Sequence, residues 1–355
     1  MKLESFDEVR KAIQSNRTRR FHLLLGNGFS MSYDPGIFSY NALHGFIETL
    51  DDALLSKLFG IINTKNFELV MHQLENFIEL ARAFDTDPKF QSQLDAARTK
   101  LKTSMVDAIG ALHPEHVFTI PQVKLDSCAA FLKLFQDTRG SIYTTNYDLL
   151  LYWVLMRSKS LSSTDGFGRD LENPEELANG EDPDFSAELR WGKHKAEQDI
   201  FYLHGALPLF DTGIDIVKEQ YDTKHYLIQK VTNRIDQGDY PVFVTAGNGH
   251  EKLTHIRHNR YLEHAYESLA NIDGSLVSFG FNFGEYDDHI IDAINRAAKP
   301  RSKTPPKLWS IYIGAYSEGD QRHIERIASR VACKVHIFDS KTVDVWNAGA
   351  DVSPG

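Results

Sequence analysis

The chain has 355 residues, of which 42% are hydrophobic and 25% are charged, and its formal net charge at pH 7 is -10. This balance is typical of a globular protein, and the acidic net charge argues against direct binding to nucleic acid. The chain has two cysteines, Cys128 and Cys333, which exclude a disulfide scaffold and a four-cysteine zinc site. The sequence contains no apolar run of the roughly 20 residues that span a membrane and begins with no apolar signal core, so we expect a cytoplasmic protein without a membrane segment.

Seven short apolar runs have the composition of buried strands, and apolar spacing over 5–15 indicates an amphipathic helix before the first of them. The runs lie at 21–25, 141–144, 200–203, 241–245, 275–279, 308–313 and 334–338. Most are followed by a segment with helical periodicity, and strands that alternate with helices predict a mostly parallel sheet covered on both faces. The predicted fold class is therefore α/β.

Between the first two runs, almost a hundred residues carry no convincing strand pattern. Apolar residues recur at helical spacing over 67–81, and further helices are expected at 88–112 and 128–135. We predict that 39–137 form a helical insertion, and that 1–38 and 138–355 form one discontinuous domain. The stretch 158–196 is rich in Gly, Pro, Ser and acidic residues, which predicts a surface loop or a mobile cover.

The first strand leads into the sequence GNGFS at 26–30. Glycines at such a turn let the chain bend sharply and direct backbone N–H groups towards an anion. An ordinary turn between a strand and a helix is the plain alternative. The dinucleotide fingerprint of dehydrogenases needs a third glycine where Met31 stands, which disfavours hydride transfer. Ser30 is expected to donate to a phosphate or to cap the following helix.

Two further strands end at polar residues that suit chemistry on a sugar. Asn146 and Asp148 follow the run at 141–144, and His204 follows the run at 200–203. Doubly wound sheets bind ligands at the carboxyl ends of their strands, so we expect Asn146 and His204 to face one another across one pocket. The plain alternatives are helix capping for Asn146 and Asp148 and a structural role for His204.

A second group of polar residues lies nearer the end of the chain. It contains four histidines, at His250, His255, His258 and His264, but no carboxylate or cysteine completes a metal-binding spacing. A surface or partner-contact role is favoured, and no metal is expected. Lys252 is considered as a contact to a phosphate or an acidic partner, and the triplet Asp287-Asp288-His289 is interpreted as helix capping with a contact at the edge of the ligand.

Four motifs follow one another in fixed order: GNGFS at 26–30, TTNYD at 144–148, LHG at 203–205 and GFNFGEYDDHI at 280–290. Together they resemble the sirtuin-like superfamily, in its bacterial NAD-hydrolysing branch of the anti-phage defence type. The segment 240–290 is also similar to a bacterial subfamily within that group. The resemblance covers the strand framework from about 21 to 338 and implies a six-stranded, doubly wound Rossmann-like domain that binds NAD as its substrate.

The resemblance also implies residue roles at the reacting end of NAD. Asn146 would orient a ribose hydroxyl or the attacking water, Asp148 would hold the nicotinamide carboxamide, and His204 would act as general base. Phe29 and Phe38 would close over the nicotinamide, with core packing as the alternative for Phe38. The residues implied to line the pyrophosphate are Gly26, Asn27, Gly28, Phe29 and Ser30.

At the adenosine end, the resemblance places Gly280, Phe281 and Asn282 near the ribose and Gly314 near the adenine. Two positions depart from the deacetylase pattern, because Thr145 replaces a glutamine and Asn282 replaces a serine. Deacetylase members also carry a four-cysteine zinc ribbon, which two cysteines cannot supply. Water is therefore the expected acceptor.

The sequence thus predicts an NAD glycohydrolase that releases nicotinamide and ADP-ribose without a metal ion. By family analogy, it would be an effector of bacterial anti-phage defence. Its activity would be controlled by assembly into a homo-oligomer or by a partner such as a HerA-type ATPase, with 39–137 as the contact region. The alternatives are an NAD-dependent deacylase or ADP-ribosyltransferase, and a non-catalytic sensor of NAD or ADP-ribose that switches a partner.

Overall fold

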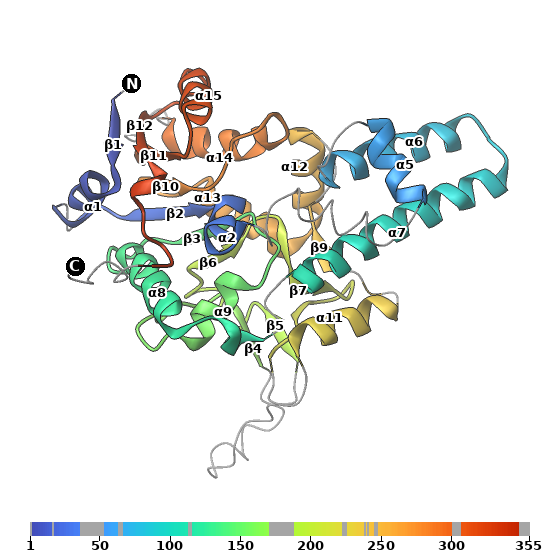
Figure 1. Cartoon of the computed structure of the whole chain (residues 1–355), viewed down its shortest axis with the longest axis horizontal. Helices are drawn as coiled ribbons and strands as arrows, with labels where there is room; N and C mark the ends of the chain where they lie inside the picture. The colour runs from blue at the N-terminus through green and yellow to red at the C-terminus, as the bar shows by residue number, and fades with distance from the viewer. Residues whose placement is uncertain are drawn as a thin grey trace, which may run out of the picture.

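A computed structural model describes residues 2–15, 18–35, 53–62, 67–112, 116–169, 188–221, 226–237, 239, 241–244, 248–299 and 307–347. A seven-stranded parallel sheet with the order β1-β12-β11-β10-β2-β3-β6 forms its centre (Figure 1). Helices flank this sheet, so the predicted α/β class is confirmed. The strands are β1 (Leu3–Ser5), β2 (Phe21–Leu25), β3 (Ile142–Thr144), β6 (Ile200–Tyr202), β10 (Gly274–Phe279), β11 (Leu308–Ala315) and β12 (Lys334–Asp339).

Six of these strands have the Rossmann order. From β2 the chain moves outward through β3 and β6, then returns to β10 beside β2 and continues the other way through β11 and β12. After β2 and β10 the chain therefore leaves the carboxyl edge in opposite directions, and such a point is where these sheets bind ligands. The prediction of six strands missed β1, an edge strand that pairs with β12.

Helices cover both faces of the parallel sheet. α8 (Gln122–Gln136) connects β2 to β3, and α14 (Asp288–Ala298) connects β10 to β11. Because the two halves of the sheet grow in opposite directions, right-handed crossovers place these helices on opposite faces. α1 (Phe6–Ser15) joins the α8 face, where the Phe6 and Phe131 ring centroids lie 5.7 Å apart.

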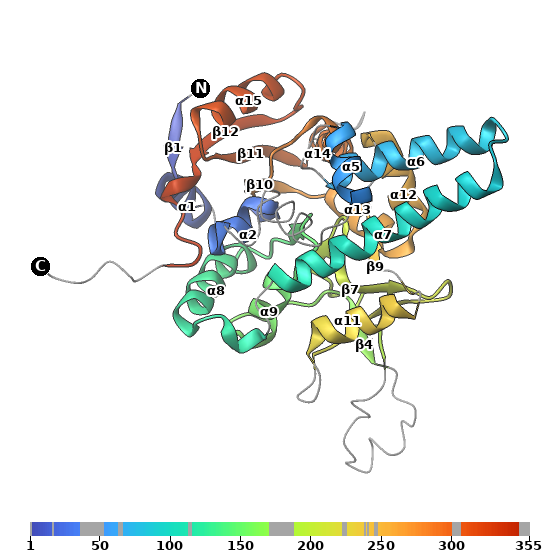
Figure 2. The same ribbon diagram turned by 45° about the vertical axis from the view of Figure 1, so that its right-hand side comes forward.

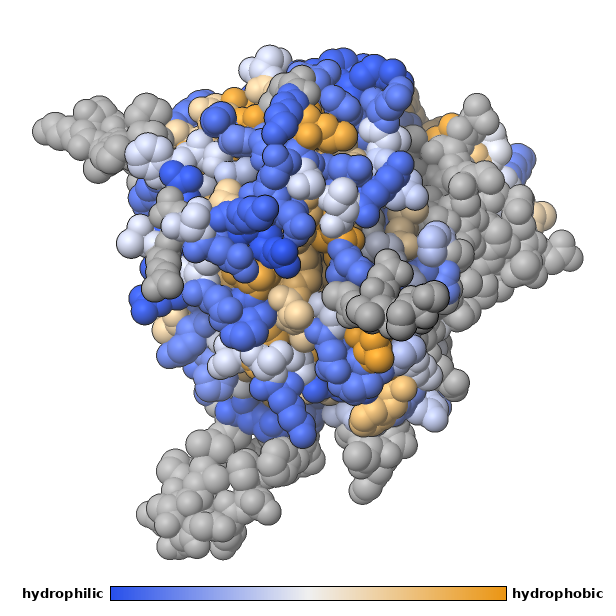
Figure 3. All heavy atoms as spheres, turned by 60° about the vertical axis from the view of Figure 1, so that its left-hand side comes forward, coloured by the Kyte–Doolittle hydropathy of each residue, from blue (hydrophilic) through white to orange (hydrophobic). Residues whose placement is uncertain are grey.

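The remaining helices complete the layers. α9 (Leu150–Arg157) packs beside α8, whereas α12 (Gly249–His258) and α13 (Arg260–Leu269) pack with α14. α15 (Glu318–Ala328) connects β11 to β12. On the face shown in Figure 3, most coloured residues are hydrophilic and hydrophobic ones show between them in small groups. Within the described ranges, no helix has both the length and the apolar content that a membrane crossing requires.

A second, antiparallel sheet was not predicted. It has the order β4-β5-β8-β7-β9, with β4 (Phe167–Arg169), β5 (Leu189–Trp191), β8 (Ile216–Lys218), β7 (Gly205–Asp211) and β9 (Pro241–Phe243). The assignment of 241–245 to the parallel sheet is therefore wrong, because β9 pairs with β7. Part of the predicted loop 158–196 forms β4 and β5, and 170–187 lie outside the described residues. α11 (Leu227–Asp236) packs on β7.

The described part of the predicted insertion consists of helices and the short connections between them. α5 (Ala53–Ile62), α6 (Phe67–Ala83) and α7 (Pro88–Leu112) share a small apolar core of their own. The α6–α7 hairpin extends away from the parallel sheet in both ribbon views (Figures 1 and 2). α8 instead belongs to the main core. The boundaries 39–137 remain a prediction, and Phe38 lies outside the described residues.

Backbone hydrogen bonds join the turns after β2 and β10. The N–H of Gly26 donates to the carbonyl oxygen of Phe279 at 3.0 Å, and that of Gly28 donates to Gly280 at 2.9 Å. A Cβ on Gly28 would lie 2.6 Å from the Cα of Gly280, whose φ of +71° itself favours glycine. These glycines let two chain segments touch. The N–H groups of Gly26 and Gly28 therefore bond within the chain, and contact of this turn with an anion stays a prediction.

This contact predicts the effect of adding one methyl group. We expect Gly28→Ala to lower the free energy of unfolding by about 1–3 kcal/mol, because its Cβ would overlap the opposing backbone. Urea denaturation measures the change. The control is Gly60→Ala in α5, whose Cβ would meet no atom within 4 Å and which we expect to be neutral or stabilising by up to about 1 kcal/mol. Equal stability of Gly28→Ala and the wild type would contradict the contact.

Candidate functional site

The predicted catalytic residues lie at the carboxyl edge of adjacent strands. Thr144 of β3 and Tyr202 of β6 are register partners, so Asn146 and His204 each lie two residues beyond one member of this pair. The N–H of Leu203 donates to the carbonyl oxygen of Thr144 at 2.8 Å, which continues the pairing towards the site. The sheet thus brings to one edge two side chains that are 58 positions apart along the chain.

Ser30 links the two polar residues of the TTNYD motif. This side chain lies in α2 (Asn27–Tyr33), is fully buried, and accepts a hydrogen bond from Nδ2 of Asn146 at 2.9 Å. Its hydroxyl donates to Oδ2 of Asp148 at 2.5 Å. The one hydroxyl hydrogen of Ser30 is donated to Asp148, so it is not available to a phosphate in this conformation, and Ser30 lies within α2 and does not cap it. Both expected roles are replaced by a bridge between Asn146 and Asp148.

Of the two residues in the TTNYD motif for which helix capping was the alternative, Asp148 takes this role and Asn146 does not. Oδ1 of Asp148 accepts the N–H of Leu150 at 2.9 Å, which satisfies a donor at the start of α9. Asn146 does not cap this helix, since its amide bonds to Ser30. Thr145 is fixed to β2 because its N–H donates to the carbonyl oxygen of Leu25 at 3.0 Å.

Phe29 does not lie over the glycine turn. Its side chain is only 1% exposed, and its ring centroid lies 5.1 Å from that of Trp346. The Trp346 indole also donates to the carbonyl oxygen of Phe29 at 3.1 Å. The expectation that Phe29 closes over a ligand is wrong for this conformation, because the ring belongs to the core.

The other predicted NAD contacts surround the same edge. The amide of Asn27 lies 3.3 Å from Sδ of Met31, and the partly exposed Asn27 begins α2. Phe281 packs edge-on against the Phe283 ring at 4.7 Å, whereas Asn282 between them is exposed. Gly314 lies in β11, two strands from β2, where a Cβ would come 2.9 Å from the Phe338 ring.

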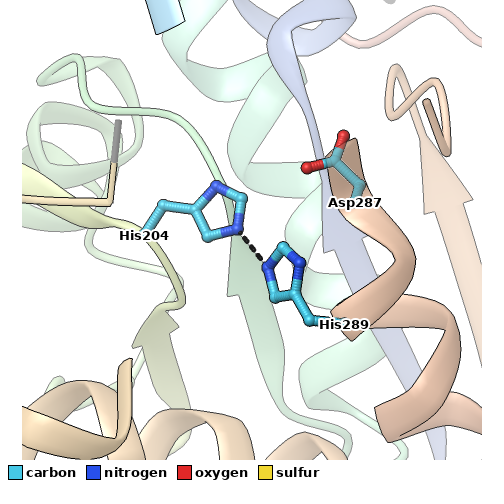
Figure 4. A group of neighbouring side chains, drawn as sticks. All are labelled: His204, Asp287 and His289. Carbon is cyan, nitrogen blue, oxygen red and sulfur yellow. Dashed lines mark hydrogen bonds between the residues drawn. The ribbon is translucent and has the colours of Figure 1, made fainter. Parts of the chain in front are cut away.

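His204 forms a pair with His289, which was interpreted from sequence as part of a helix cap. The two Nε2 atoms lie 2.8 Å apart, and the rings stack at 29° with their centroids 5.0 Å apart (Figure 4). His204 is 2% exposed and His289 is 1% exposed. His289 was detectable in principle, since a histidine on the buried stripe of α14, with Ala293 and Ala297, requires a polar partner inside the protein.

An ion pair between a buried lysine and a partly buried aspartate lies beside the two imidazoles. Nζ of Lys252, in α12, lies 3.1 Å from Oδ1 of Asp287, at the end of the short helix η2 (Glu285–Asp287). Lys252 is 1% exposed. The expected contact of this lysine with a phosphate or a partner is thus replaced by a partner within the chain. The capping role of the triplet is also wrong, because Asp288 pairs with Arg330 and Asp287 with Lys252.

Burial keeps both imidazoles neutral. It lowers the pKa of His204 well below the ordinary 6.5, and the neighbouring His289 and Lys252 lower this pKa further. Burial also lowers the pKa of His289 to about 3, again with a contribution from the charge of Lys252. A neutral imidazole has a lone pair, so His204 is in the form that a general base requires at pH 7.

The same residues have the donor types of a metal site. Ligand atoms of His204, Asp287 and His289 lie within 4.8 Å of one another, and this is the one such group among the described residues. The distance of 2.8 Å between the imidazole nitrogens is, however, that of a hydrogen bond. Lys252 already supplies the positive charge that balances Asp287. The arrangement is therefore accounted for by its own hydrogen bond and ion pair.

The histidines between 250 and 264 serve other roles. Nδ1 of His258 lies 2.7 Å from the carbonyl oxygen of Thr254 in its own helix, and the ring of His264 packs against Trp191 and Phe201. They form no group of close ligand atoms in the described part of the chain.

A cavity of about 430 Å³ lies at the opposite edge of the parallel sheet, where β2, β3 and β10 begin. Its lining includes Arg20, Tyr143 and Asp273 but none of the predicted site residues. Because the chemistry of Asn146 and His204 lies at the carboxyl edge, we place the candidate site there and not at this cavity.

A family model described as a domain of unknown function (DUF4917) matches residues 23–346. The chain therefore belongs to this family. No curated protein matches it. The matched range includes the glycine turn, Asn146, His204 and His289, so all of the site lies within the family's domain.

The Ser30 bridge predicts a measurable loss of stability. We expect Ser30→Ala to lower the free energy of unfolding by about 1–3 kcal/mol, because it leaves the buried amide of Asn146 and the partly buried carboxylate of Asp148 without this partner. Chemical denaturation measures the loss. Ser15→Ala, which removes an exposed hydroxyl at the end of α1, serves as the control and should change stability by less than about 0.5 kcal/mol. A Ser30→Ala protein as stable as this control would argue against the bridge.

The low pKa values of the two histidines predict how stability depends on pH. Unfolded histidines bind protons below about pH 6.5, whereas folded His204 and His289 do not, so the unfolded state binds more protons. Stability is therefore full above pH 6.5 and falls as the pH drops from 6.5 towards 3. Each histidine contributes a slope of about 1.4 kcal/mol per pH unit.

A double variant, His204→Gln with His289→Gln, tests this dependence. Its unfolding free energy, measured between pH 4.5 and 6.5 by denaturation, should fall less steeply than that of the wild type, by up to about 2.7 kcal/mol per pH unit. His250→Gln replaces an exposed histidine and should leave the slope nearly unchanged. Identical slopes for the double variant and the wild type would mean that the buried pair is protonated in the folded protein.

Proposed function

We propose that this member of the DUF4917 family is an NAD glycohydrolase, which cleaves NAD to nicotinamide and ADP-ribose. The main support is the placement of Asn146 and His204, each two residues beyond the register pair Thr144↔Tyr202 on adjacent parallel strands. An amide and an imidazole thus lie at one edge, beside the first turn of a Rossmann-ordered sheet. The order of the four motifs, which resembles that of sirtuin-like NAD-hydrolysing proteins, is the second line of support.

The chemistry requires only these two residue types. Cleavage of the nicotinamide–ribose bond passes through an oxocarbenium-like centre, so an oriented water is sufficient as nucleophile. Asn146 would orient that water or a ribose hydroxyl. As the water oxygen bonds to the anomeric carbon, His204 takes its proton, and nicotinamide leaves with the electron pair of the broken C–N bond. The products are nicotinamide, ADP-ribose and one proton.

Positioning of the amide would come from the first helix of the domain. Ser30 accepts a hydrogen bond from Nδ2 of Asn146 and donates one to Asp148, and the amide oxygen of Asn146 would then face the ligand. This orients the amide before NAD binds, which lowers the cost of reaching the reactive geometry. Asp148 would keep its implied contact with the carboxamide as well, since a carboxylate can accept about four hydrogen bonds. The further NAD contacts proposed are Gly26, Asn27, Gly28, Thr145, Gly280, Phe281, Asn282 and Gly314.

The biological setting belongs to the same proposal. NAD depletion harms the cell that carries such an enzyme, which fits an effector of bacterial anti-phage defence that acts in the cytoplasm. Control would come from assembly into a homo-oligomer or from a partner such as a HerA-type ATPase. The α6–α7 hairpin, which extends from the body and carries exposed Phe77, Leu80 and Phe84, is the proposed contact region.

The test is turnover of NAD by the purified protein. We expect release of nicotinamide and ADP-ribose, and a loss of about 10²–10⁴ fold in kcat for His204→Ala and for Asn146→Ala. Chromatography of the products measures the rate. The exposed His250→Ala serves as the matched control and should retain full activity.

Two outcomes would count against the proposal. Full activity in both site variants, with unfolding curves like that of the wild type, would remove the proposed mechanism. Tight binding of NAD by calorimetry without any turnover, in the purified protein and in cells that express it, would instead favour the sensor alternative.

A further inference from the structure

The contact between His204 and His289 constrains where the protons of both rings lie. Their Nε2 atoms are 2.8 Å apart, a distance at which one proton lies between them. If both Nε2 atoms carried a proton, the two protons would clash. If neither did, the two nitrogen lone pairs would repel each other. Each neutral imidazole carries one proton, so the pair has two arrangements, with either His204 or His289 as the donor.

We propose that His289 is a positioning residue that accepts the Nε2–H of His204 and so leaves a lone pair on Nδ1 of His204, the atom through which this imidazole acts as base. The inference rests on the proposed NAD glycohydrolase function. Nδ1 of His204 points away from His289 (Figure 4), and it makes no hydrogen bond to another described residue. In the opposite arrangement Nδ1 carries the proton, and His204 has no lone pair to offer a water molecule.

The surrounding charges keep His289 able to accept. An imidazolium has no lone pair, so protonation of His289 would end its role as acceptor. The ammonium of Lys252 disfavours a second positive charge on either ring, and it is itself held by Asp287 at 3.1 Å. The charge of Lys252 therefore favours two neutral rings, whereas the carboxylate of Asp287, whose ligand atom lies within 4.8 Å of those of both rings, opposes this effect in part.

The backbone also fixes the position of His289. This residue lies in the first turn of α14, and α12 packs directly against that turn. A Cβ on Gly249, the first residue of α12, would lie 3.1 Å from the backbone nitrogen of His289. The acceptor is therefore held by helix packing as well as by its partner, as a positioning residue needs to be.

The first test reads the tautomer directly and needs no turnover. Protein labelled with ¹⁵N at its histidine rings gives separate signals for protonated and unprotonated ring nitrogens, and His204→Gln and His289→Gln spectra assign them. At pH 7 we expect the proton of His204 on Nε2 and that of His289 on Nδ1. A His204 ring protonated at Nδ1 would overturn the inference, whether or not the protein hydrolyses NAD.

The second test separates positioning from a merely structural role. His289→Leu removes the acceptor and should lower kcat by about 100-fold with little change in KM, because substrate binding does not use His289. His289→Gln, whose amide oxygen can accept the same hydrogen bond, should retain kcat within about tenfold of the wild type. A folded His289→Leu protein with wild-type kcat would overturn the positioning role while leaving the proposed function intact.

Metal analysis of the purified protein tests the alternative that His204, Asp287 and His289 bind a metal ion. We expect less than about one tenth of an equivalent of zinc, iron or manganese. A stoichiometric metal ion lost in His289→Leu would overturn the inference, because an Nε2 atom bound to a metal carries no proton. The absence of NAD turnover combined with the expected tautomer would refute the proposed function alone.

Discussion

The backbone contact between the turns after β2 and β10 determines the geometry of the whole site. It joins the two halves of the parallel sheet where the chain reverses direction, through hydrogen bonds that only glycines allow at this distance. Ser30 follows the first turn, and His289 lies in the first turn of α14, the helix after the second. The contact therefore sets the distance between the Ser30 bridge, built on the first half, and the histidine pair, which draws one ring from each half.

The free-energy cost of burying polar and charged groups then limits which side chains the site can contain. Isolated charges and polar groups are costly inside a protein, so each buried member needs a partner. Lys252 has Asp287, Asn146 and Asp148 share Ser30, and the two imidazoles share one hydrogen bond. The exception is Nδ1 of His289, which is buried without a hydrogen-bond partner among the described residues. The imidazoles are neutral because burial and the nearby ammonium both oppose their protonation. The result is a pair of neutral imidazoles beside one ion pair.

The sequence predicted those parts of the fold that local patterns encode. Runs such as 21–25 and 275–279 are long and apolar enough to identify buried parallel strands, and the helix 88–112 was predicted with its observed bounds. The antiparallel sheet was missed because strands such as Phe167–Arg169 and Ile216–Lys218 have three residues, too few for an alternating pattern. The roles of Gly28 and His289 depend on segments some 250 and 85 positions away, which no local pattern contains.

Under the proposed function, the low pKa of the buried His204 places a requirement on the ligand. A neutral ligand would leave the pKa of His204 as low as it is without a ligand. Under the proposed function, NAD brings a pyrophosphate with negative charge to the edge next to the first glycine turn. An anion favours the imidazolium form and raises the pKa of the histidine, which opposes the effects of burial and of Lys252. Binding of the dinucleotide and activation of the base would then be coupled through the charge of the ligand, so that His204 becomes an effective proton acceptor only when its substrate is bound.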